Sequence, residues 1–578
     1  MKRRTKRKHE RRERDSLRRR ILSLLAVLLM MVLVLPAASA RHKEKETSAV
    51  QKIIYVPHDN RPISNKQTVE VAQKLGVEVV VPPDKLLGDR QNLGNPEELW
   101  GWLEDNLDDA DAAVISSDSM LYGSLVGSRK HSCSETELLT RTERFRKLHQ
   151  AYPKLPLYVF GSIMRTPKSG EASGREEPDY YRSYGSDIFR YTVLKDKEEL
   201  KGLTKREQKE SAFLQKLIPA ADLKDWLDRR KKNYSINEKL IRMARENTFN
   251  YLILGRDDNA PYSQTHKESR HLIEESQDLD TARFQIMAGI DEMGMLLISR
   301  AVNIAHKEVP SVYVKYNWGQ GAATVPAYSD EKISDSIRSA VAAANGMLTT
   351  DPARADLVLM VNTDVQGKTY EANDPSNDSA SARHSSVYFA GLVEDYVQKG
   401  YLVGIADILY ANGADNALME ELRKRGLLFK IRAYAGWNTA TNSTGFVIGA
   451  GMLTKYMQPN DIEELLLTRY LDDWVYQSNI RNTVQRQLSW LRGEGYYGSL
   501  DEKRKAVGIR TSQMIARFAE QNLPPFKSLE EIQVTFPWNR MFEADIARSE
   551  HKEIHFFKNS VQSVKETAKK RKKKASLR

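Results

Sequence analysis

Four short apolar segments decide the fold: Lys52–Val56 (KIIYV), Glu78–Val81 (EVVV), Ala112–Ser116 (AAVIS) and Leu157–Phe160 (LYVF). Helical patterns separate them, at residues 65–75, 96–107 and 134–150. Near-continuous apolar strands that alternate with helices are typical of a parallel sheet covered by helices on both faces. The first part of the body is therefore predicted to be an α/β region.

The alternation of predicted strands and helices is interrupted at residues 171–247 and then resumes. Residues 171–247 are charged and mostly helical in pattern, and they predict a helical insertion. About ten β–α units are too many for one eight-stranded barrel and favour two lobes with doubly wound parallel sheets. The later strands are expected at Tyr251–Leu254, Phe284–Ala288, Val312–Lys315, Leu357–Val361, Tyr401–Ile405 and Phe429–Arg432.

These patterns divide the body into four parts. We expect a first α/β region at 41–170, the helical insertion at 171–247 and a second α/β region at 248–460. Residues 461–557 show amphipathic helical patterns and no strand pattern, so they predict a helical C-terminal region.

Composition excludes several classes of protein. The chain has 578 residues, of which 29% are charged and 40% hydrophobic, so it is neither a polytopic membrane protein nor wholly disordered. Its single cysteine, Cys133, excludes a disulfide scaffold and any multi-cysteine metal site. The net charge of +12 comes from the two ends, because residues 1–40 carry +9 and residues 558–578 carry +8, which leaves −5 for the body. A nucleic-acid ligand is therefore not expected.

The N-terminal 40 residues have the pattern of a secretory signal peptide. A basic stretch precedes the uncharged apolar run Ile21–Leu35, and Ala38-Ser39-Ala40 supplies small residues before a cleavage point at Arg41. An uncleaved membrane anchor is the alternative, because residues 21–40 are long enough to span a bilayer. Both interpretations predict an extracytoplasmic body, either secreted or anchored to the membrane.

The last 21 residues, 558–578, are almost wholly basic between Lys569 and Lys574 and predict a disordered tail. A solvated tail is one interpretation. Contact with an anionic envelope polymer or membrane is the other.

Polar residues follow nearly every predicted strand. In parallel α/β sheets, ligands bind beyond the carboxyl ends of the strands, so these residues are candidates for a polar cleft. Each one alone fits a turn or a helix cap equally well. The candidates for substrate binding are Asp59, Arg61, Asp118, Arg256, Asn259, Trp318, Asp407, Trp437 and Asn438.

An exported carbohydrate-active hydrolase is the leading functional hypothesis. Carboxylates and amides suit a glycan or another hydroxyl-rich small molecule, and the aromatic faces of Trp318 and Trp437 could stack on sugar rings. Glycoside hydrolysis needs two carboxyl groups roughly 5 to 9.5 Å apart. Asp258 and Asp291 are the preferred pair, and their neighbours Asp257 and Glu292 are the other catalytic candidates. This hypothesis needs no cofactor.

Two alternatives remain open. The first is a hydrolase that binds Mg²⁺ or Ca²⁺, because both are hard cations that oxygen ligands suit. Its ligands would be Asp59, Asp118, Asp257 and Asp364, with Arg61 or Arg256 holding an anionic group. The second is a non-catalytic extracytoplasmic protein that binds a solute or glycan between two lobes.

Five motifs of the chain resemble those of a known family: Val56–Pro62, Gly255–Tyr262, Ala288–Gly294, Asn317–Gly321 and Ala433–Thr444 (AYAGWNTATNST). On these motifs the chain is similar, from about residue 52 to residue 500, to the bacterial domain-of-unknown-function family 4127. The first motif of that family more often resembles Leu-Asp-Asp-Arg-Pro, and here His58 and Asn60 replace its first and third residues. The resemblance implies the span of the folded body and implies no activity.

Overall fold

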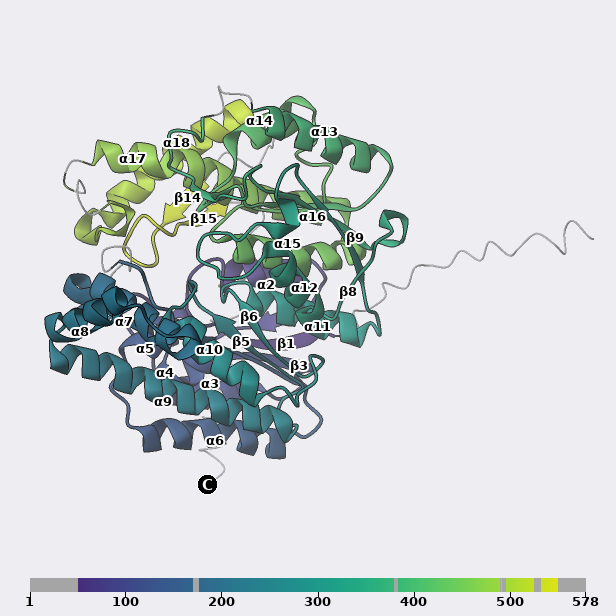
Figure 1. Cartoon of the computed structure of the whole chain (residues 1–578). Coiled ribbons are helices and arrows are strands. Elements are labelled where there is room, and N and C mark those ends of the chain that lie inside the picture. The colour runs from purple at the N-terminus through teal and green to yellow at the C-terminus, as the bar shows by residue number, and fades with distance from the viewer. Residues whose placement is uncertain are drawn as a thin grey trace, which may run out of the picture. The chain divides into compact units, whose positions relative to one another are not determined.

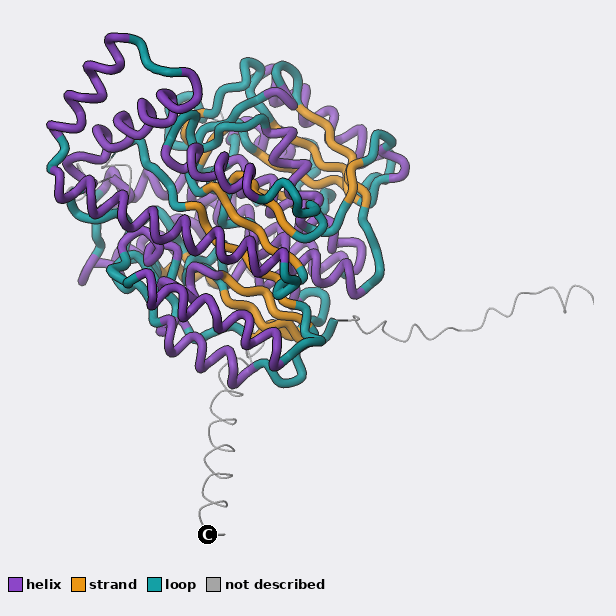
Figure 2. The backbone as a smooth tube through the Cα atoms, turned by 60° about the horizontal axis from the view of Figure 1, so that its bottom comes forward, coloured by secondary structure: helices purple, strands orange, loops and turns teal. Residues whose placement is uncertain are grey.

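The computed structural model describes residues 50–169, 176–378, 383–488, 490, 495–523 and 532–548. The predicted signal segment and the basic tail lie outside these residues. Two parallel sheets with helices on their faces form the body, which confirms the predicted α/β class. Figure 2 shows the strands as two groups with helices packed around them.

The first sheet has six strands in the order β2-β1-β3-β4-β5-β6, and every pair is parallel. The chain therefore adds β2 on one side of β1 and all later strands on the other, so the sheet has a switch point between β1 and β3. The strands are β1 Lys52–Val56, β2 Glu78–Val80, β3 Ala112–Ser116, β4 Leu157–Ile163, β5 Tyr251–Arg256 and β6 Phe284–Ala288.

The second sheet repeats this topology. Its order is β13-β11-β9-β7-β8, so the second strand is again at the edge and a switch point lies between β7 and β9. All of its pairs are parallel too. The strands are β7 Ser311–Tyr316, β8 Met347–Leu348, β9 Leu357–Asn362, β11 Val403–Asp407 and β13 Ala433–Ala435.

The helices connect and cover these strands (Figure 1). Those of the first half are α2 Lys66–Gln73, α3 Pro96–Asn106, α4 Ser117–Tyr122, α5 Leu125–Lys130, α6 Glu135–Ala151, α7 Tyr181–Lys201, α8 Lys205–Leu217, α9 Ala220–Arg245 and α10 Gln264–Glu275. Those of the second half are α11 Met293–Ala305, α12 Ile333–Ala343, α13 His384–Gln398, α14 Asn416–Lys424, α15 Ala440–Leu453, α16 Pro459–Arg469, α17 Arg481–Gln487 and α18 Arg504–Asn522. None of the described helices is both long enough and apolar enough to cross a membrane.

The described part of the predicted insertion consists mainly of α7, α8 and α9. The first sheet continues beyond it, because β5 pairs with β4 and β6 pairs with β5. The boundary expected at residue 248 therefore falls within the first sheet and not between the two sheets.

Two local expectations were wrong. Phe429–Arg432 is not a strand, because pairing with β11 begins only at Ala433, opposite Gly404. Residues 461–557 were expected to lack strands, yet β14 (Ile532–Thr535) and β15 (Asp545–Arg548) form an antiparallel pair there. Alternating exposure along β14 fits a strand with one buried face, which is a short and weak sequence signal. A further small parallel pair joins β10 (Tyr370–Glu371) to β12 (Tyr410–Ala411).

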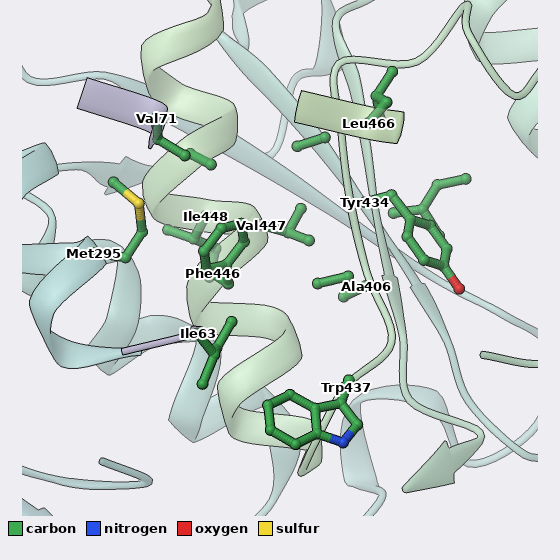
Figure 3. Close-up of a cluster of buried hydrophobic side chains, with 14 of the residues drawn as sticks. Ile63, Val71, Met295, Ala406, Tyr434, Trp437, Phe446, Val447, Ile448 and Leu466 are labelled. Carbon is green, nitrogen blue, oxygen red and sulfur yellow. The ribbon is translucent and has the colours of Figure 1, made fainter. Parts of the chain in front are cut away.

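One hydrophobic core joins the two sheets. Helix α15 is buried along its whole length, and its side chains meet those of α11 and of strands β11 and β13. Figure 3 shows Phe446, Val447 and Ile448 of α15 between Met295 of α11 and Tyr434 of β13. Because this core is continuous, residues from both sheets are held in fixed positions around a shared site.

Candidate functional site

A polar cavity of about 110 Å³ lies at the carboxyl ends of the first sheet, and the second half of the chain contributes Tyr328 after β7, Asn412 after β12 and the residues that follow β13. Its volume is somewhat below the ~150 Å³ of an engineered cavity that binds benzene, so it can take a small molecule or one ring of a larger ligand. The lining residues are Arg61, Leu125, Arg129, Arg165, Glu176, Asp257, Asp258, Gly289, Ile290, Asp291, Tyr328, Asn412, Asn438, Thr439, Thr441, Asn442, Tyr497, Arg540 and Phe542.

Asp291 is the most strongly held carboxylate of this cavity. The loop after β1 brings Arg61 to it, with Arg61 Nη2 at 2.5 Å from Asp291 Oδ1 and Nη1 at 3.2 Å from Oδ2. His58 Nε2 lies 3.0 Å from the same Oδ1. Arg61 also donates to Asp59 Oδ2 at 2.9 Å, so Asp59 orients the arginine from behind. These fixed donors keep Asp291 charged and directed at the cavity.

Two asparagines complete this cluster, Asn438 in the loop after β13 and Asn442 in the first turn of α15. Asn442 Nδ2 donates to Asp291 Oδ2 at 3.1 Å, and Asn438 Nδ2 donates to the same atom at 3.4 Å. The loop is itself anchored, because Gly436 N donates to Asp473 Oδ2 at 2.7 Å. Asp473 belongs to the π-helical stretch Tyr470–Ile480, a helix type often found at functional sites.

The opposite wall is a network of arginines and carboxylates. Arg129 donates to Glu176 Oε2 and to Asp257 Oδ2, both at 2.6 Å. Arg165 donates to Asp258 Oδ2 at 3.0 Å. Arg540, far away in the sequence, donates to Glu176 Oε1 at 2.7 Å. Four segments of the chain, around residues 129, 165–176, 257–258 and 540, therefore meet at one wall of the cavity.

The two preferred catalytic carboxyls differ in their ionisation. Burial opposes the charge of Asp291, but the Arg61 guanidinium and the His58 hydrogen bond outweigh it, so the pKa of Asp291 is far below its usual range. For Asp258, burial and the neighbouring Asp257 charge outweigh Arg165 and raise its pKa to about 6. In many hydrolases one carboxyl with a raised pKa acts as the general acid, and a second carboxyl with a lower pKa stays charged.

Two more carboxyls are buried behind the lining. Asp118, on α4 directly after β3, has a pKa raised to about 7 by burial, and its Oδ2 has no partner among the described residues. Glu292 precedes α11, and burial raises its pKa to about 8. Neither of its oxygens has a hydrogen-bond partner in the described part of the chain. The buried surroundings of both carboxyls therefore favour their neutral acid forms.

The structure brings together some of the predicted site residues and separates others. Arg61, Asp257, Asp258, Asp291 and Asn438 line the cavity, whereas Asp59, Asp118 and Glu292 lie behind it. Arg256 instead pairs with Asp330 and Glu331. Asn259 accepts hydrogen bonds from Ala260 and Ser263 in its own turn.

Three residues predicted from the second sheet lie outside the cavity lining. Asp407 is fully buried and accepts hydrogen bonds from Asn362, Tyr434 and the backbone of Asp415. Trp437 is 2% exposed and packs in the core near the start of α15 (Figure 3), so it cannot stack on a ligand in this arrangement. Trp318 is 72% exposed on the loop after β7. The aromatic surface of the cavity comes from Tyr328, Tyr497 and Phe542 instead.

The four proposed metal ligands do not form one group. Asp364 follows β9 and accepts hydrogen bonds from Gln366 N and Lys368 N of its own loop. Asp59 is paired with Arg61, and Asp257 with Arg129. Within the described ranges, no three His, Cys, Asp or Glu side chains are close enough together to hold a metal ion.

Sequence reasoning missed several lining residues. Arg165 follows β4 by two positions, and Asn442 lies four residues after Asn438 in the Ala433–Thr444 motif, so both could have been found. Arg129, Glu176 and Arg540 follow no sheet strand, and only the tertiary structure brings them to the cavity.

Comparison with known families agrees with the resemblance seen in the motifs. The family model described as "Protein of unknown function (DUF4127)" matches residues 53–547. The chain belongs to this family. The match extends beyond the span of the motifs and takes in α18 and the strand β14, and therefore also Arg540 and Phe542 of the cavity. No curated protein and no solved structure matches the chain.

Proposed function

We propose that this DUF4127 protein is a hydrolase that acts on glycosidic bonds. The observation that carries the proposal is the pair Asp258 and Asp291, which line one cavity and whose pKa values are shifted in opposite directions. Strands β5 and β6 pair with Arg256 opposite Ala288. Asp258 and Asp291 follow these residues by two and three positions, so both lie beyond the carboxyl ends of neighbouring strands.

The hydrogen bonds suggest a different role for each carboxyl. Asp258 is the proton donor to the leaving oxygen, because its raised pKa of about 6 leaves about half of it in the acid form at pH 6, far more than an unperturbed aspartate keeps. Both oxygens of Asp291 already accept hydrogen bonds from Arg61. Asp291 therefore acts as a fixed negative charge that stabilises the positive charge developing on the sugar ring.

The cavity also supports a sugar as the ligand. Tyr497 and Phe542 stack with ring centroids 5.0 Å apart and present aromatic surface to the cavity. Amide and hydroxyl groups of Asn438, Thr439 and Thr441 line the same space and can bind ligand hydroxyls. The ligand is a glycan or a similar hydroxyl-rich molecule.

The test compares wild type with Asp258→Asn on two kinds of substrate. Oligosaccharides need protonation of a poor leaving group, whereas 4-nitrophenyl glycosides release a good one. Asp258→Asn is expected to lower kcat/KM on oligosaccharides by about 10²–10⁴-fold and to affect the aryl glycosides much less. Asp291→Asn is expected to lower both rates, because its charge acts on the ring.

The matched control is Asp364→Asn, which keeps the hydrogen bonds of an exposed loop and is expected to leave both rates unchanged. Circular dichroism confirms the fold of each variant. Absence of any glycosidase activity in wild type, or equal losses of Asp258→Asn on both substrates, would contradict the proposal.

The proposed site of action is outside the cytoplasm, on the basis of the N-terminal sequence. Cleavage after Ala40 gives a mature protein that begins at Arg41. N-terminal sequencing of the exported fraction tests this cleavage. Recovery of an intact Met1 terminus only from soluble cytoplasm would contradict export. Contact of the basic tail with an anionic envelope polymer or membrane is part of the same proposal.

A further inference from the structure

The cavity lining holds four arginines and four carboxyls, and carboxyls are in excess once the other ion-pair partners of these arginines are counted. Four arginines line it, namely Arg61, Arg129, Arg165 and Arg540. Arg481 lies behind it and donates to the carbonyl oxygens of Asn412 and Phe542. The carboxylates in contact with the lining arginines are more numerous: Asp59, Glu176, Glu177, Asp257, Asp258, Asp291 and Glu543.

The arginines are already engaged by this excess of carboxylates. Each of the four lining guanidinium groups donates to at least one carboxylate oxygen within 3.0 Å. An anionic ligand would have to displace one of these internal partners and would add to the negative charge. The raised pKa values of Asp258 and of Glu177 have the same origin, because burial and neighbouring carboxylates disfavour their charged forms. The cavity is thus poorly suited to a phosphate, a sulfate or a uronic acid.

Two acceptor atoms remain open to a ligand. Asp257 uses Oδ2 for Arg129, and its Oδ1 takes part in none of the hydrogen bonds within the described part of the chain. Asn442 is 4% exposed and lines the cavity, and its Oδ1 has no partner among the described residues. A buried acceptor without a partner, such as Asn442 Oδ1, is costly unless a ligand supplies a donor. Asp257 Oδ1 and Asn442 Oδ1 can therefore accept hydrogen bonds from a ligand, and ammonium and hydroxyl groups are suitable donors.

We propose that the glycan carries a free primary amine, so that the substrate is an amino sugar whose ammonium group binds Asp257 and whose hydroxyls reach Asn442. This inference rests on the proposed function and names its class of substrate. The ammonium pairs with Asp257 and not with Asp258, the proton donor of the proposed function. An N-acetylated sugar lacks the charge, and a uronic acid carries the wrong one.

Binding without turnover tests the inference separately from hydrolysis. The probes are tetramers of glucosamine, of N-acetylglucosamine and of galacturonate, titrated into the Asp258→Asn protein by calorimetry. The glucosamine tetramer is expected to bind about 10- to 100-fold more tightly than the N-acetylated one, because a charged hydrogen bond is gained. The galacturonate tetramer is expected to bind most weakly.

The variant Asp257→Asn, in the same background, keeps the size of the side chain and removes its charge. It is expected to reduce the preference for the amine to less than threefold, whereas Asp364→Asn leaves that preference unchanged. Equal affinities for the three tetramers, tightest binding of the acid, or no binding of any of them would overturn the inference. In that case the proposed function would still be supported if the protein hydrolyses a neutral glycan and Asp258→Asn slows oligosaccharides much more than aryl glycosides.

Discussion

The buried carboxyl of Glu292 should make stability depend on pH in a way that one substitution removes. Its side chain is 1% exposed and lies against two glycines. A Cβ at Gly289 would lie 2.1 Å from Glu292 Oε1, and a Cβ at Gly445 would lie 2.4 Å from Cγ. The carboxyl thus has no room to rotate toward water, and Glu292→Gln replaces it with an uncharged group of the same shape.

The magnitude follows from the pKa of Glu292, which burial raises from 4.5 to about 8. Below pH 4.5 both the folded and the unfolded state hold the proton, so the group adds no pH dependence. Between pH 4.5 and 8 the unfolded chain releases the proton while the folded chain keeps it, and wild type loses stability as pH rises. One unit of pKa corresponds to about 1.4 kcal/mol, so the loss between pH 5 and pH 8 is at most about 4 kcal/mol.

Urea unfolding of wild type and Glu292→Gln at pH 5 and at pH 8 measures this effect. The new amide group has a burial cost that is the same at both pH values. The test therefore compares the stability difference between wild type and Glu292→Gln at pH 5 with the same difference at pH 8. That difference is expected to shift by about 2–4 kcal/mol in favour of Glu292→Gln on going to pH 8. The matched control is Glu104→Gln on the exposed face of α3, which should show no such shift. A difference between wild type and Glu292→Gln that is equal at both pH values would refute the reasoning.

Three further outcomes are expected. Gly445→Ala should destabilise the fold by about 1–3 kcal/mol, because the added Cβ would collide with Glu292. Glu292→Ala removes that collision, so the double variant should lose less stability than the sum of the two single losses. Strictly additive losses would contradict this packing. Arg61→Met leaves Asp59 and Asp291 buried without their cation and should lower the free energy of unfolding in urea by about 3–5 kcal/mol. An unchanged urea midpoint would show that the ion pairs of Arg61 are not needed for stability. Under the proposed function, kcat/KM on oligosaccharides should fall as pH rises through about 6, where Asp258 loses its proton, and a flat profile from pH 5 to pH 8 would exclude Asp258 as the acid.

The expected strands of the first sheet were accurate because each is a buried apolar segment with few polar interruptions. β1, β3 and β6 have the predicted bounds, whereas β4 continues three residues further and β5 two residues further, toward the residues that approach the cavity. Short strands such as β13 and β14 were misplaced or missed, since three or four residues carry little periodic pattern. The repeated strand order of the two sheets left no repeat in the sequence, because topology constrains connections more than residue identities.

The sequence by itself determined the parallel α/β class, the family and a set of polar residues at strand ends, because hydrophobic periodicity and the strand-end rule act locally. It could not decide which of those residues share a cavity. Asp291 follows β6 and Asp407 ends β11, yet Asp291 lines the cavity with Arg61 and Asp407 is buried in the second sheet. Arg129, Glu176 and Arg540 are brought together only by packing of distant segments. Long-range contacts and the desolvation that they cause set the ionisation of the site, and neither can be read from spacing along the chain.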